Sequence, residues 1–129
     1  MPEDLNTLAA WVGILLGMLS GIHAGLFFQR EDWLGGYGSW PRRMLRLGHI
    51  AFFGIGLLNL GYALTLKYLG WPQPHALASG ALAASTLLMP LVCMLAAWRK
   101  PLRHLFFVPT SCLLAGVVGL LWARLGASI

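Results

Sequence analysis

Four long apolar segments dominate this sequence and restrict what it can fold into. They cover residues 8–28, 47–66, 76–98 and 102–122. Each holds at least about 18 residues, the length that an α-helix needs to cross a hydrocarbon core roughly 30 Å thick. Backbone polar groups in lipid must bond to one another, which favours helices. The sequence therefore predicts an all-α integral membrane protein, with the whole chain, residues 1–129, forming one domain of four transmembrane helices.

The composition agrees with a lipid environment. Of the 129 residues, 58% are hydrophobic and 10% are charged, whereas soluble domains carry roughly 25% charged residues. The net charge of +5 does not indicate a nucleic-acid partner, because most basic residues stand in two short connections beside the spans. The acidic N-terminus lacks the positive region of a cleavable signal, so we expect the first helix to remain in the mature protein. Cys93 and Cys112 lie in apolar segments and are expected to stay reduced.

The first segment carries a ladder of small residues. Glycines recur every fourth position and so fall on one stripe of a helix; they are Gly13, Gly17, Gly21 and Gly25. In water each would cost roughly 1 kcal/mol relative to alanine. In lipid the missing side chains let a second helix approach closely. We call this stripe the glycine seam. The sequence leaves open whether the seam packs inside the protein or against another chain.

Several local signals place the helix ends. Asn6 is expected to cap the first helix, and residues 39–43 resemble the start of an interfacial helix leading into the second span. Pro72 and Pro74 form a stiff turn, and Pro101 suits a first helical turn. Such short connections force antiparallel neighbours, so the sequence predicts an up-down four-helix bundle in which the second and fourth helices sit diagonally.

The basic residues predict an orientation. They cluster around the first and third connections, whereas the opposite side has only Lys67 and Arg124. Under the positive-inside rule these two connections are cytoplasmic. In a bacterial inner membrane, both termini would then be periplasmic. The clustered residues are Arg30, Arg42, Arg43, Arg46, Arg99, Lys100 and Arg103.

Histidines are the candidate functional residues, because ionisable side chains inside spans are rare and costly. His23 lies six residues before Gln29, roughly 9 Å into the membrane. His49 and His104 follow the basic connections closely, so all three belong to the predicted cytoplasmic half. His49 and His104 would face each other across the bundle, with His23 as a possible substitute. Two imidazoles on facing helices are typical of a bis-histidine haem b site.

Other residues fit the haem hypothesis, and simpler interpretations compete with it. Arg46 and Arg103, together with Arg42 and Arg43, could pair with the haem propionates. His104 could equally cap or snorkel at a helix start, His49 could face headgroups, and His23 could bond a carbonyl or Asn59. A copper site is a further alternative, and so is a pigment whose magnesium one histidine ligates. The copper site would draw on His23, His49, Cys93, Met94 and His104.

The sequence supports two functions from different classes. The first is a small redox subunit that passes electrons through one haem b. The second is a cofactor-free accessory subunit that docks through the glycine seam on a larger membrane complex, or on a second copy of itself. We expect no catalytic activity of its own, because the chain has no nucleophile–base pair, phosphate loop or zinc-type spacing. A transporter is disfavoured because no acidic residue lies inside a span.

Overall fold

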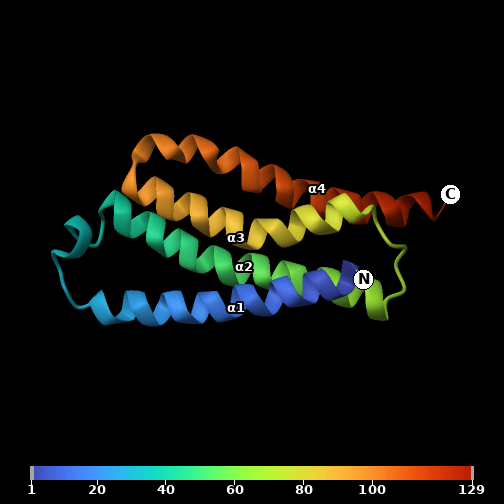
Figure 1. The fold of residues 1–129 in the computed structure, drawn as a ribbon, viewed down its shortest axis with the longest axis horizontal. Helices are drawn as coiled ribbons and strands as arrows, with labels where there is room; N and C mark the ends of the chain where they lie inside the picture. Colours follow the sequence, from blue (N-terminus) through green and yellow to red (C-terminus); the bar gives the residue numbers. More distant parts are fainter. Residues whose placement is uncertain (1, 129) are drawn as a thin grey trace.

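A computed structural model shows an all-helical fold of four antiparallel helices, and the structure describes residues 2–128. Both described chain ends and the α2–α3 connection lie at one end of the molecule, whereas the other two connections lie at the opposite end (Figure 1). We call the latter the arginine-rich end. All four helices are long and apolar enough to cross a membrane. The elements are α1 (Pro2–Phe27), the 3₁₀ helix η1 (Trp33–Gly35), α2 (Trp40–Tyr68), α3 (Ala76–Trp98), the 3₁₀ helix η2 (Lys100–Phe106) and α4 (Phe107–Gly126).

The helices do not close into a square bundle. α1, α2 and α3 pack on one another, whereas α4 packs along α3 (Figure 1). Glycines explain this contact, because a Cβ at Gly116 would lie 2.6 Å from the Leu82 Cβ, and one at Gly119 would lie 2.5 Å from the Ala78 Cβ. The second and fourth helices have no extensive contact, as expected, but α1 packs on α3 rather than on α4, so the second and fourth helices do not face each other across a four-helix axis.

The glycine seam packs inside the protein. A Cβ at Gly13 would lie 3.0 Å from the Phe52 carbonyl oxygen of α2, and one at Gly17 would lie 2.8 Å from the Phe53 ring. Gly25 has nothing within 4 Å. Most of the seam is therefore occupied by α2, and only its last member remains open.

Asn6 does not cap the first helix, because α1 already begins at Pro2. Asn6 is fully buried, and its amide donates to the Asn59 side-chain oxygen at 2.7 Å and to the Ser79 carbonyl at 3.2 Å. The Ser79 hydroxyl donates to Asn6 in return. The Asn59 amide also donates to the Thr86 hydroxyl at 3.1 Å. This polar cluster joins α1, α2 and α3 near the end that carries the termini.

Two local features fasten the arginine-rich end. Ser39 caps α2, accepting a 3.4 Å bond from the Arg42 backbone N–H, so residues 40–46 continue directly into the second span. The Trp40 indole donates to the Ala96 carbonyl of α3 at 2.7 Å. The third helix keeps its expected bounds, and the fourth begins as η2 before α4.

Candidate ligand cavity at the arginine-rich end

An apolar cavity of about 330 Å³ lies between α1, α2 and α3. α1 contacts α3 through Asn6 and Gly13. The cavity begins beyond these contacts, in the half of α1 that is closer to the arginine-rich end. Residues 16, 20, 23 and 24 recur at helical spacing, so α1 presents them on one face. The cavity is lined by Leu16, Leu19, Ser20, His23, Ala24, Trp33, Leu45, His49, Phe52 and Met94.

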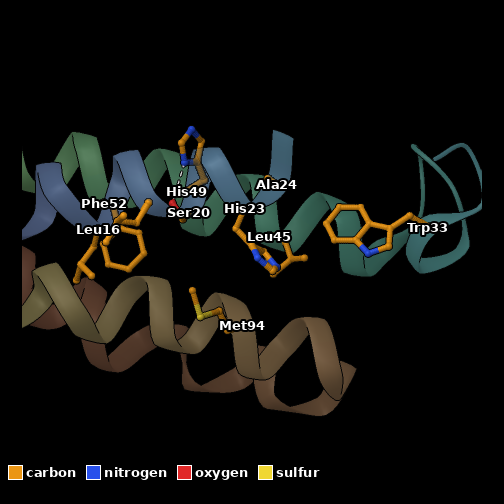
Figure 2. Close-up of a pocket in the computed structure, with 10 residues that line it drawn as sticks. Leu16, Ser20, His23, Ala24, Trp33, Leu45, His49, Phe52 and Met94 are labelled. Carbon is orange, nitrogen blue, oxygen red and sulfur yellow. Dashed lines mark hydrogen bonds between the residues drawn. The ribbon is translucent and has the colours of Figure 1, made fainter. Parts of the chain in front are cut away.

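His23 and Met94 occupy facing walls of this cavity. Figure 2 shows the His23 ring, from α1, and the Met94 side chain, from α3, pointing into the same gap between the helices. The His23 ring packs on Phe27 of its own helix, with 5.2 Å between ring centroids. The cavity thus presents one imidazole and one thioether on largely apolar walls.

His49 lines the same cavity, but its ring is held elsewhere. The ring lies against α1, where a Cβ at Gly21 would be 2.7 Å from the His49 Cε1, and it points away from the His23 ring (Figure 2). Its Nδ1 lies 2.9 Å from the Ser20 hydroxyl, which itself donates to the Gly17 carbonyl at 2.9 Å. A hydroxyl has one hydrogen, so Ser20 accepts the Nδ1–H of His49. In the neutral ring this leaves the lone pair on Nε2.

His104 and Arg103 do not join this site. Both side chains are exposed on η2, and neither lines the cavity. The expected facing of His49 and His104 therefore fails, because α4 follows α3 rather than closing the bundle. His49 and His104 are not brought together; His23 and His49 both line the cavity, but their rings point in different directions.

The residues suggested for copper are also divided. Cys93 is fully buried, and its Cβ would lie 3.1 Å from a Cβ at Gly48, in the α2–α3 contact rather than in the cavity wall. Across residues 2–128, no group of three or more His, Cys, Asp or Glu side chains could hold a metal ion.

A cluster of arginine and aromatic residues closes the cavity toward the arginine-rich end. Arg42 is only 5% exposed, donates to the Phe28 carbonyl at 3.2 Å, and lies 5.3 Å from the Trp33 ring centroid. Arg46 lies 4.2 Å from the Tyr37 ring centroid. A smaller cavity of about 60 Å³ lies against Arg42, Arg46 and His49.

Sequence reasoning missed this cluster. The Trp33 ring stacks on Phe27, with 5.3 Å between ring centroids, and also lies 5.3 Å from the Arg42 guanidinium. The sequence did offer one signal: Arg42, Arg43 and Arg46 lie close together, directly after a connection rich in aromatic residues. The sequence alone does not indicate which aromatic ring contacts which arginine.

The fold and the cavity define a class: a four-helix membrane protein with an apolar, histidine-bearing cavity near its arginine-rich end. Comparisons with protein families, with curated proteins and with solved structures find no match to this chain.

Proposed function

We propose that this protein is a small membrane redox subunit that binds one haem b between α1, α2 and α3 and passes electrons through it. The observation that carries the proposal is the arrangement of His23 and Met94, which point from facing helices into one apolar cavity. Histidine and methionine are both axial ligands of haem iron, and a flat macrocycle suits a gap between helices.

The proposed ligand set differs from the pair expected from the sequence. His23 and Met94 are the residues that would hold the haem, which would supply one-electron redox chemistry when bound. His49 lines the neighbouring wall, but its ring bonds to Ser20 and points away from His23, so it is not part of the proposed ligand set. His104 and Arg103 lie outside the cavity, so they have no role in the proposed haem site.

Size and charge are compatible with a partly enclosed haem. The cavity of about 330 Å³ is at the lower end of the roughly 300–1,000 Å³ typical of ligand sites. A haem held here would therefore be only partly enclosed by the protein. Arg46, beside the smaller adjoining cavity, is the proposed partner of a propionate. Its guanidinium is already ordered against Tyr37.

A difference spectrum tests this proposal. Protein purified from haem-replete cells should show a reduced-minus-oxidised α-band, and His23→Ala should abolish it. His75→Ala is the matched control, because His75 is an exposed histidine at the other end of α3, and it should leave the band unchanged. A folded, colourless wild-type protein would contradict the proposal.

Replacing Met94 separates its role from that of His23. Met94→Leu should retain haem but convert the spectrum from low spin to high spin, because the sixth ligand is lost. Met94→His should restore the low-spin spectrum at a lower potential, since methionine ligation raises the potential of haem. An unchanged spectrum in both variants would exclude Met94 as a ligand.

The second candidate is a cofactor-free accessory subunit of a larger membrane complex or a homo-oligomer. The glycine seam is largely occupied by α2, so such docking would use another face. A groove of about 350 Å³ between α1 and α3 offers small residues, where a partner helix could approach closely. These are Ala9, Gly80, Ala83 and Ala84. A colourless protein that copurifies with a partner would favour this candidate.

A further inference from the structure

We propose that the crease between α2 and α4 binds an anionic phospholipid, with an acyl chain along the crease and the phosphate held by Arg43 and Arg103. This site is separate from the haem cavity and does not depend on it.

The crease follows from the way α4 is attached. Because α4 packs on α3, its side toward α2 is left without a helix partner, and a groove of about 530 Å³ remains between them. Gly54 lines it with nothing within 4 Å of the position that its Cβ would occupy. Its walls are almost wholly apolar and come from Leu47, Ile50, Ala51, Gly54, Ile55, Leu58, Met89, Phe106, Thr110 and Leu113.

Two arginines stand at the mouth of this groove. Arg43 precedes Leu47 by four residues in α2, so both lie on the same helix face. Arg103 precedes Phe106 by three residues in η2, and side chains three apart eclipse in a 3₁₀ helix. Both arginine side chains are exposed. They therefore project beyond the groove at the arginine-rich end.

The chain offers these arginines few internal counter-charges. The sequence holds four acidic residues, and none follows Asp32. α2, α3, η2 and α4 therefore carry no carboxylate side chain. Arg42 and Arg46 are placed against aromatic rings, whereas Arg43 and Arg103 have no such contact in the described part of the chain. A phosphate accepts paired guanidinium bonds well, and basic sites between membrane helices commonly hold anionic headgroups.

The amount of lipid that stays bound to the protein tests this proposal. Protein in nanodiscs of phosphatidylcholine is titrated with phosphatidylglycerol, and bound lipid is counted by native mass spectrometry after release. The wild type should retain one phosphatidylglycerol per chain in preference to phosphatidylcholine. The Arg43→Gln/Arg103→Gln variant should weaken this retention roughly thirtyfold.

A matched variant removes the same charge elsewhere. Arg99 lies 5.0 Å from the Trp98 ring centroid, and Arg124 lies 5.8 Å from that of Trp71, and neither is placed at the mouth of the groove. Arg99→Gln/Arg124→Gln should retain lipid as the wild type does. An equal loss in both double variants would show a general charge effect and would overturn the proposal.

The groove itself is tested with two glycines of α2. Gly54 and Gly61 both have open space at the Cβ position, but only Gly54 lines the groove. Gly54→Leu should displace the lipid, whereas Gly61→Leu should not. Retention by Gly54→Leu, or equal retention of the two lipids by the wild type, would overturn the proposal. Displacement by millimolar inorganic phosphate would identify a phosphate site without an acyl chain, and would also overturn it.

Discussion

Polar side chains inside the helices of this protein bond chiefly to one another or to backbone carbonyls. The amide of Asn59 donates to the Ile55 and Leu82 carbonyls at 3.0 and 3.2 Å as well as to Thr86. The bonds to Leu82 and Thr86 run from α2 to α3, so this one amide joins two helices. Asn6 was missed, because an Asn near a helix start has the same sequence pattern whether it caps the helix or lies buried within it.

Removing the central amide should weaken the fold. Asn59→Leu leaves the Asn6 amide and the Thr86 hydroxyl without their partner, and unsatisfied buried groups cost about 1–3 kcal/mol. We expect the free energy of unfolding to fall by about 2 kcal/mol, measured by denaturant titration in mixed micelles. Thr110→Val is the control, because the exposed Thr110 hydroxyl bonds only to the Phe106 carbonyl one turn earlier. Equal stability of Asn59→Leu and the wild type would contradict this account of the cluster.

At the scale of helices, apolar length and small-residue spacing predicted the four elements, but not their partners. Residues 76–98 were predicted as one span, and α3 has those bounds. The glycine stripe indicates that some helix approaches closely, yet a stripe carries no information about which one. Here α2 occupies most of it. The cavity could not be predicted from the sequence either, because it exists only where α1 diverges from α3, and the sequence does not show which helices pack together.

Glycine substitutions should separate the packed part of the seam from its open end. In Gly13→Leu, the added side chain would meet the Phe52 carbonyl at 3.0 Å and the Thr86 methyl at 2.7 Å. Overpacking of this kind costs about 1–3 kcal/mol, so the thermal midpoint in detergent should fall. Gly25→Leu has open space and should change the stability by less than about 0.5 kcal/mol. Equal losses in both variants would contradict the internal packing of the seam.

For the whole molecule, the up-down antiparallel four-helix bundle was predicted and is confirmed, although α4 packs on α3 and not on α1. α4 has only Pro109 and Gly116 buried among its described residues. Short connections enforce antiparallel neighbours, but they do not decide whether the fourth helix returns to the first. That choice depends on Gly116 and Gly119 of α4, which allow it to pack closely on α3. As a result, His104 was predicted beside His49 and lies outside the cavity instead.

The orientation in the membrane is a separate prediction. The arginine-rich end should be cytoplasmic and the termini periplasmic, because of the bias in basic residues. In a background with Cys93→Ser and Cys112→Ser, Ser128→Cys should react with an impermeant maleimide added to spheroplasts. Glu31→Cys, on the exposed first connection, should react only in inverted vesicles. The reverse labelling pattern would contradict this orientation.

An absorbance titration of haem into the protein in nanodiscs tests whether the cavity between α1, α2 and α3 holds a haem. We expect saturation at one haem per chain, with a low-spin spectrum that His23→Ala eliminates and His75→Ala leaves intact. A titration indistinguishable from haem partitioning into empty nanodiscs would contradict it.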